Sequence, residues 1–399
     1  MAPARLVAPR TRVGISRIIL GAAVTVAALL LSGCTEPPKT ETFWSPDGRT
    51  IACLSRDALF LYDVKAKTSA KLATGAGAIA SPCWSPDGKV IAFYSASGHG
   101  DTIAPSVSVN ALDLATGKVQ VLRTQPWPRP TAEQPSSEQP AEEVIRWMAL
   151  FYGQPASWSP DGRQLACVGP DPAGTAISLL SYPSKTAARI VRTAGVIGWL
   201  AWSPDGRKIA YAWFPRPEPR HHWVSSLWVH DLATSTTTKV ADLDEGSPVE
   251  GTRIVWSADS GRIGFIGRGP GRRLTPEADG VADTYLPGRE IACLVEAGPG
   301  AKVTTVMPEI SELAAWAPGL AGIAFAEFKW EADPPRFDED AVLVYRGLQP
   351  PMREVLGVLP GVRDASHSSV PQFSVDGRQV SLTAGSAGGT PQVLVFALP

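Results

Sequence analysis

Polar and apolar positions along the chain follow a short pattern that recurs from residue 44 to the C-terminal end. Its first copy reads WSPDGRTIAC over residues 44–53. The segment 45–48 has tight-turn chemistry, because Pro46 fixes φ, Asp47 can bond its own backbone and Gly48 tolerates a positive φ. The apolar residues 51–53 that follow can be buried. The pattern therefore predicts a strand end, a turn and a second strand.

Seven copies of this pattern can be counted. They begin at Trp44, Trp84, Trp158, Trp202, Trp256, Trp316 and Phe373. The first four are nearly identical, and the copies at Trp256 and Phe373 are recognisable variants. The segment at Trp316 keeps only the tryptophan and the apolar residues 323–325, and we count it because it lies between two better copies.

The spacing of the copies indicates how the chain is organised. They are separated by 40 to 74 residues, and each is followed by a third apolar run, as in 58–63 and 226–231, and a short fourth one, as in 239–241. Repeats longer than about 40 residues that are built from strands are typical of propeller blades. We expect an all-β protein in which residues 42–399 form one β-propeller, most simply of seven four-stranded blades. Six blades would follow if the Trp316 unit were not a blade, but the segment from Trp256 to Phe373 is too long for one.

The last copy stops one strand short after the apolar run 392–397. A propeller removes its open sheet edge by closing the ring. We therefore expect residues 36–43 to complete the last blade, so that the N- and C-terminal segments pair.

The repeated motif has the form WSPDG(R/K)xIA(F/Y) and is followed by a further strand, such as LDLATGKVQVL at 112–122. It resembles the TolB-type β-propeller repeat. The resemblance covers nearly all of residues 42–399 and implies the propeller fold. Such repeats occur in envelope scaffold proteins, in the non-catalytic propellers of prolyl-oligopeptidase-like peptidases and in a few propeller lyases. The resemblance therefore does not fix the function.

The N-terminal segment predicts export. Residues 1–17 hold four arginines and no acid, and the apolar run 18–31 is short for a membrane span. Residues 1–33 thus read as a signal peptide, and the ending Leu31-Ser32-Gly33-Cys34 resembles the bacterial lipobox, which implies a lipid on Cys34. With 34–41 as a short tether, we expect an envelope protein on the inner leaflet of the outer membrane or the outer face of the cytoplasmic membrane. The alternative is a signal-anchor with an incidental cysteine.

The net charge bears on the kind of partner, and the cysteines bear on the core. Removing four of the 37 basic residues with the signal peptide leaves 33 against 38 acidic ones, which does not favour nucleic acid. Cys53 and Cys167 occupy a motif position that is aromatic in other copies, so we expect both to be buried. The sequence leaves open whether Cys53 and Cys83 form a disulfide. No cofactor is expected, and the oligomeric state is not indicated.

Strand order places the long insertions on one face. The turns of the repeated motif lie on one face, and the insertions 95–105, 214–225, 267–289 and 327–340 and the Pro-rich segment 126–152 fall on the opposite face. We expect a short apolar helix at 142–152, and we expect the motif residues to build the ring rather than a site. Loop aromatics and histidines are typical of binding surfaces. The candidate binding residues are Trp127, Trp147, Trp213, Trp223, Trp330, His99, His221 and His222. The alternative is that these rings only pack the loops onto the rim.

These patterns favour a non-catalytic module that binds a protein, a peptide or a glycan in the envelope. The sequence contains no nucleophile elbow and no P-loop. The alternative is a metal-dependent propeller enzyme, a polysaccharide lyase or hydrolase, that uses the histidines and the acidic run 331–340 of the insertion-bearing face.

Overall fold

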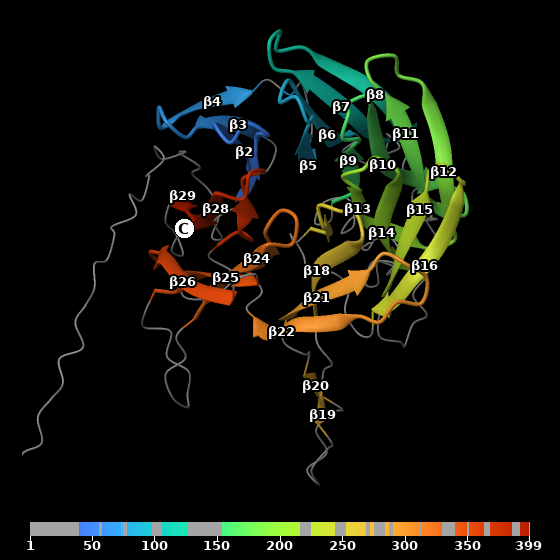
Figure 1. Cartoon of the computed structure of the whole chain (residues 1–399). Coiled ribbons are helices and arrows are strands. Elements are labelled where there is room, and N and C mark those ends of the chain that lie inside the picture. Colours follow the sequence, from blue (N-terminus) through green and yellow to red (C-terminus); the bar gives the residue numbers. More distant parts are fainter. Residues whose placement is uncertain are drawn as a thin grey trace, which may run out of the picture.

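The structure is a computed structural model. It describes residues 40–55, 58–72, 74, 78–97, 106–126, 154–215, 225–243, 253–268, 272–274, 284–286, 290–310, 313–328, 340–348, 351–362, 368–384 and 392–398. These residues form antiparallel sheets arranged as blades around a central channel (Figure 1). The predicted seven-bladed, all-β propeller is confirmed, and the unit that begins near Trp316 is a blade.

The first four blades follow one another along the chain. Blade 1 contains β1 (Thr40–Trp44), β2 (Thr50–Ser55), β3 (Ala58–Asp63) and β4 (Thr68–Leu72). Blade 2 contains β5 (Ala78–Trp84), β6 (Val90–Ser97), β7 (Ser106–Asp113) and β8 (Val119–Pro126). Blade 3 contains β9 (Ala156–Trp158), β10 (Gln164–Asp171), β11 (Gly174–Ser181) and β12 (Ala187–Thr193). Blade 4 contains β13 (Val196–Trp202), β14 (Lys208–Phe214), β15 (Ser225–Asp231) and β16 (Thr236–Leu243).

The last three blades complete the ring. Blade 5 contains β17 (Val255–Trp256), β18 (Arg262–Arg268), β21 (Glu290–Glu296) and β22 (Thr304–Ile310), and a small hairpin, β19 (Arg272–Leu274) with β20 (Thr284–Leu286), lies between β18 and β21. Blade 6 contains β23 (Ala314–Trp316), β24 (Gly322–Glu327), β25 (Val342–Leu348) and β26 (Pro351–Val358). Blade 7 contains β27 (Gln372–Phe373), β28 (Gln379–Ala384) and β29 (Gln392–Ala397). Blade 7 has three strands in the part of the chain that is described.

The repeated turn is held by one hydrogen-bond network. In blade 3 the Ser159 hydroxyl donates to Asp161 Oδ1 at 2.6 Å and accepts from the Gln164 amide at 2.9 Å. The Arg163 amide donates to the same carboxylate at 3.1 Å, and Gly162 has a φ of 70°. The hydroxyl of Ser159 is the main cause that lowers the pKa of Asp161. Because each group satisfies another, the motif fixes the register of the first two strands of its blade.

Neighbouring blades are joined through motif tryptophans. The indole N–H of one blade donates to a main-chain carbonyl of the preceding blade. The pairs are Trp84 to Phe43, Trp158 to Cys83, Trp256 to Ala201 and Trp316 to Phe265, at 3.0 to 3.3 Å. Trp202 departs from this pattern, because its indole N–H is buried and has no hydrogen-bond partner.

The predicted closure of the ring is wrong for residues 40–43. These residues belong to β1, which pairs with β2 inside blade 1, and β29 pairs with β28 alone among the described strands. The motif turn fixes Trp44 opposite Ile51, so this segment is already the first strand of its own blade. Residues 36–39 lie outside the described part.

In the described part of the chain, side chains join blade 7 to blade 1. The Trp44 indole donates to the carbonyl oxygen of Gln372 at 3.0 Å, and the Ser381 hydroxyl donates to Thr42 Oγ1 at 3.2 Å. Val393 of β29 packs in an apolar cluster with Trp44. The indole-to-carbonyl hydrogen bond that joins other neighbouring blades is therefore also present between blades 7 and 1.

The four cysteines that the structure describes are free thiols. Cys53, Cys83, Cys167 and Cys293 form no disulfide, which answers the open question on Cys53 and Cys83. Cys53 and Cys167 are buried as expected, and burial raises the pKa of each thiol to about 12. Within the described ranges there is no helix with the length and hydrophobicity that a membrane span requires.

Candidate functional site

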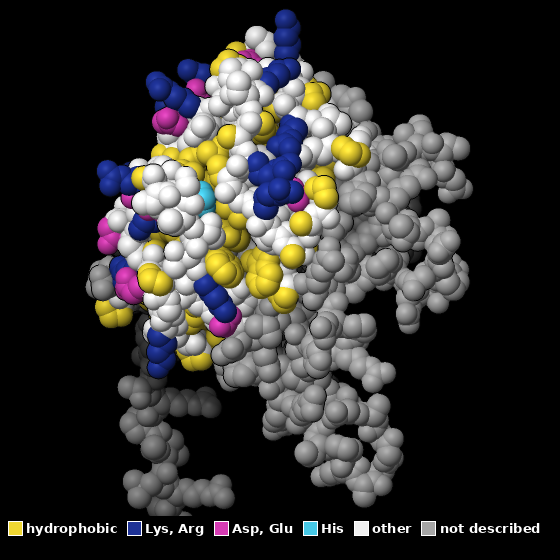
Figure 2. Space-filling view, turned by 90° about the vertical axis from the view of Figure 1, so that its right-hand side faces the viewer, with side chains coloured by type: hydrophobic (Ala, Val, Ile, Leu, Met, Phe, Trp, Pro, Cys, Tyr) yellow, Lys and Arg dark blue, Asp and Glu magenta, His cyan; other side chains and the backbone are white. Residues whose placement is uncertain are grey.

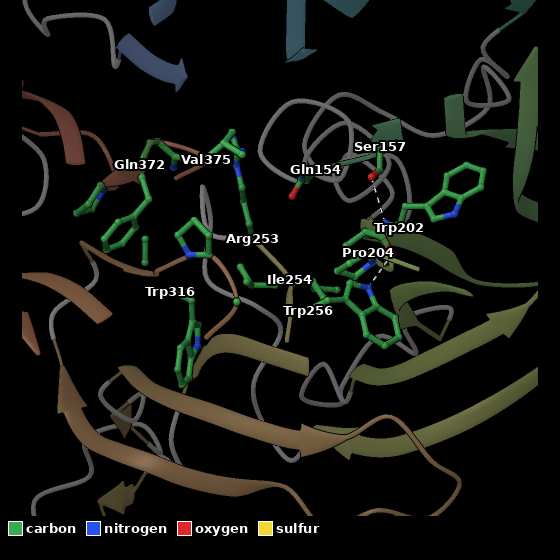
Figure 3. Close-up of a pocket in the computed structure, with 17 residues that line it drawn as sticks. Gln154, Ser157, Trp202, Pro204, Arg253, Ile254, Trp256, Trp316, Gln372 and Val375 are labelled. Carbon is green, nitrogen blue, oxygen red and sulfur yellow. Dashed lines mark hydrogen bonds between the residues drawn. The ribbon is translucent and has the colours of Figure 1, made fainter. Parts of the chain in front are cut away.

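A pocket of about 340 Å³ lies in the central channel (Figure 3). The inner strands of blades 3 to 7 and the turns beside them line it, and the lining is mostly apolar. The lining residues are Gln154, Ser157, Ala201, Trp202, Pro204, Arg253, Ile254, Val255, Trp256, Ala315, Trp316, Pro318, Gly319, Pro371, Gln372, Phe373 and Val375. Pro204 and Val375 belong to motif turns and are exposed, which places the mouth of the pocket on the face of these turns.

The strand pattern explains which residues reach the channel. Side chains alternate along a strand, so the positions one and three residues before the motif aromatic lie on the same side. The position one residue before supplies pocket residues from five blades: Ser157, Ala201, Val255, Ala315 and Gln372. The position three residues before the aromatic holds Arg253 in blade 5, which lines the pocket, and Glu41 in blade 1, whose charge acts on Arg253. These two are the only charged residues at either position of the seven copies.

Among the described residues that line the pocket, Arg253 alone carries a charge. Its side chain crosses the ring, because its guanidinium carbon lies 5.2 Å from the centre of the Phe43 ring in blade 1. Figure 3 shows it extending between Gln154 on one side and Gln372 and Val375 on the other. Burial lowers the pKa of Arg253, whereas charge interactions with Cys83 and Glu41 raise it. An arginine stays protonated under these conditions, so the channel holds a fixed positive charge.

Two polar side chains, from β9 and from the residues just before it, line the same pocket as Arg253. The Gln154 side-chain oxygen is buried and has no hydrogen-bond partner. The Ser157 hydroxyl is already engaged, because it accepts from the main-chain amide of Trp202 at 3.1 Å. A buried amide oxygen without a donor costs about 1–3 kcal/mol, which a ligand that brings an N–H or O–H would recover. The pocket thus offers one cation, one unsatisfied acceptor and indole and aliphatic walls.

Of the predicted binding residues, the structure describes Trp213 alone. Its indole N–H donates to Thr193 Oγ1 at 2.5 Å, and its ring packs edge-on against Trp228 at a centroid distance of 6.3 Å. Trp213 is half-buried and therefore packs on the rim of blade 4, near the connection between blades 3 and 4. The other seven candidates, Trp127, Trp147, Trp223, Trp330, His99, His221 and His222, lie outside the described residues, as do Cys34 and the expected helix at 142–152.

The pocket lies where the sequence did not place a site. The motif tryptophans Trp202, Trp256 and Trp316 and the turn residues around them build its wall and mouth, although we expected them only to build the ring. Arg253 and Gln154 were missed because they stand outside the conspicuous motif. Aligning the seven copies at the position three residues before the aromatic would have singled out Arg253 and Glu41.

The outer surface offers a different arrangement. Basic, acidic and apolar side chains are interspersed on the side of the ring shown in Figure 2. Arg189 and Arg192 of β12 form ion pairs of 3.0 and 3.1 Å with Asp171, whose side chain is buried. The single carboxylate of Asp171 thus offsets one of the two positive charges. Among the described residues, no group of three or more His, Cys, Asp or Glu is arranged to hold a metal ion.

Comparisons with known proteins agree with the fold. The chain resembles oligogalacturonate lyase from Vibrio parahaemolyticus, with 12% identity over 95% of this chain and 98% of that chain and a TM-score of 0.56. It also resembles the β-propeller domain of the Trilobed protease from Pyrococcus furiosus, with 13% identity over 91% and 94% and a TM-score of 0.52. The latter domain is described as having an open velcro topology.

TolB proteins are among the similar structures as well. TolB from Acinetobacter baumannii is 14% identical over 81% of this chain, has a TM-score of 0.42, and is spanned by this chain over 64% of its length. No protein-family model matches the sequence, and no curated protein matches it. The two likenesses with TM-scores above 0.5 show the fold alone at these identities, and that fold is the β-propeller that the repeated motif predicts.

Proposed function

We propose that this protein is a non-catalytic binding module of the bacterial cell envelope, whose propeller receives part of a partner in its central channel. The observation that carries the proposal is the pocket formed jointly by five blades. Its groups are those that recognise a ligand: a guanidinium, amides and aromatic and aliphatic walls. The partner is a protein, a peptide or a glycan, and the N-terminal segment supports attachment to the membrane through a lipid on Cys34.

The pocket supports binding because its lining is rigid and shared. The inner strands of blades 5 and 6 are each held to the preceding blade by an indole-to-carbonyl hydrogen bond, from Trp256 to Ala201 and from Trp316 to Phe265. Preorganised walls bind without a large ordering cost. A volume of about 340 Å³ stands at the small end of ligand pockets, which span roughly 300–1,000 Å³. The partner would therefore insert a chain end, a side chain or a short sugar segment.

Site-specific photocrosslinking in living cells tests this proposal. A photoreactive amino acid replaces Val375 at the mouth of the pocket, where the side chain is 57% exposed, and the matched control replaces Val121 on the outer strand β8, which is 46% exposed. A discrete adduct from position 375 and none from position 121 is expected. An absence of any adduct at position 375 contradicts binding in the channel.

The alternative is a metal-dependent enzyme that acts on a polysaccharide. It is kept because the fold resembles that of oligogalacturonate lyase, and its candidate ligands His221 and His222 are outside the described residues. Metal analysis of the purified protein separates the two functions. Stoichiometric metal that disappears when both histidines are replaced by alanine would favour the enzyme, whereas the binding module retains its partner adduct without metal.

A further inference from the structure

We propose that the channel pocket binds the carboxyl-terminal end of a polypeptide, with the terminal carboxylate on Arg253 and a main-chain N–H on the Gln154 side-chain oxygen. This inference rests on the proposed binding function. It adds the chemical identity of the group that enters the channel.

The charge of Arg253 selects an anion. Its guanidinium lies over the Phe43 ring and donates no hydrogen bond to a described residue. The charges of Cys83 and Glu41 also act on it, and the planar fork of a guanidinium matches the two oxygens of a carboxylate. A partly buried cation of this kind gains more from an anionic ligand than an exposed one does, because the interaction is less screened by water.

Gln154 adds a requirement for a donor close to the anion. Its side-chain oxygen is buried without a partner and lines the same pocket as Arg253. Figure 3 shows this oxygen directed toward the middle of the channel. In the last residue of a polypeptide, the carboxylate and the amide N–H are both attached to the α-carbon. This residue can therefore bind Arg253 through its carboxylate and the Gln154 oxygen through its N–H at the same time.

The walls favour a peptide over an acidic sugar. Trp256, Ile254 and Phe373 present apolar surface to the pocket, which suits an aliphatic or aromatic terminal side chain. A uronic acid would bury several hydroxyl groups against these walls, and each unpaired hydroxyl would cost free energy. Capture of a free carboxylate by a fixed site is also an established mode of peptide recognition.

The direct experiment compares a free acid with its amide. The probes are three acetylated tripeptides, acetyl-Gly-Ala-X with X as Ala, Leu or Phe, each prepared with a free carboxylate and with a terminal amide. Their dissociation constants for the full-length protein are measured by titration in NMR. At least one free acid is expected to bind ten times or more tightly than its amide, a difference of about 1.4 kcal/mol.

Charge variants assign the preference to the pocket. Arg253→Gln should remove the preference for the acid, and Arg253→Lys should keep part of it. Glu41→Gln should tighten binding of the acid, because the charge of Glu41 acts on Arg253. A circular dichroism melt reports whether Arg253→Gln folds. If it does not fold, the affinities of Arg253→Lys and Glu41→Gln still test whether Arg253 binds the carboxylate.

Trigalacturonate is titrated as a further probe, and four results would overturn the inference. They are equal affinity for acid and amide, no binding of any peptide, a preference that survives in Arg253→Gln, and tighter binding of trigalacturonate than of every peptide acid. If any of these occurs while position 375 still gives a partner adduct, the binding function stands and only the carboxylate assignment fails. Without an adduct the binding function itself fails.

Discussion

The two motif tryptophans Trp202 and Trp256 are both buried, with 8% and 5% exposure, but they differ in one hydrogen bond. The Trp256 indole N–H donates to the Ala201 carbonyl at 3.1 Å, whereas the Trp202 indole N–H has no partner. Replacing each by phenylalanine removes the same atoms. The two variants therefore isolate the contribution of the hydrogen bond that joins neighbouring blades.

The expected difference follows from the two local situations. Trp256→Phe leaves the buried Ala201 carbonyl without its indole donor, which costs about 1–3 kcal/mol. Trp202→Phe removes a buried donor that was never satisfied, so this term is absent or favourable. Both variants also lose packing volume by similar amounts. Trp256→Phe should therefore lower the free energy of unfolding by about 1–3 kcal/mol more than Trp202→Phe.

Equilibrium unfolding in urea, followed by far-ultraviolet circular dichroism, measures this difference. The circular dichroism signal of the strands is used because each variant changes the tryptophan fluorescence. Equal losses in the two variants, or a larger loss in Trp202→Phe, would refute the reasoning that indole-to-carbonyl bonds hold adjacent blades together.

Three further outcomes are expected. The pKa of Asp161 is lower in the folded protein, so its stabilisation is present above the unfolded pKa and is lost as the pH falls through the folded pKa. When the pH is lowered from about 6 to about 3, the free energy of unfolding should therefore fall less in Asp161→Asn than in the unmodified protein. Urea titrations at each pH measure this fall, and an equal fall in both proteins would contradict the turn network. Gly264→Ala should lower the free energy of unfolding by about 1–3 kcal/mol, because the added Cβ would lie 2.4 Å from Leu320 Cδ2. The control Gly298→Ala, whose Cβ would have nothing within 4 Å, should change it by less than about 0.5 kcal/mol. Similar melting temperatures of the two variants would be inconsistent with this packing. Cys34→Ala should abolish incorporation of an alkyne fatty acid and release the protein from the membrane fraction, and retained label would show that Cys34 is not the lipidated residue.

The repeated motif made most of the fold predictable. Its turn chemistry is local, so it marks the first two strands of each blade, and its spacing identified even the weak copy at Trp316. The role of residues 40–43 in closing the ring was predicted incorrectly, because an extended segment fits both an inner first strand and an outer last strand. Which of the two forms is decided by the pairing of Trp44 with Ile51, set by the turn that follows.

The pocket was harder to predict than the fold. Trp256 and Trp316 are conspicuous in the sequence, but that they line a cavity depends on how the blades are arranged around the axis. Arg253 becomes notable only when the copies are aligned and its reach to Phe43 is known. The isolation of the Gln154 oxygen is a property of three-dimensional burial, and no local pattern signals it.

The most direct test of a channel-binding propeller compares crosslinking from its two faces. A photoreactive residue at position 375 reports on the mouth of the pocket, and one at Ala194, which is exposed in the connection between β12 and β13, reports on the opposite face beside Trp213. The pocket predicts that the partner adduct forms from position 375 and at most weakly from position 194. A strong adduct from position 194 with none from position 375 would contradict it and would move the binding site to the insertion-bearing face.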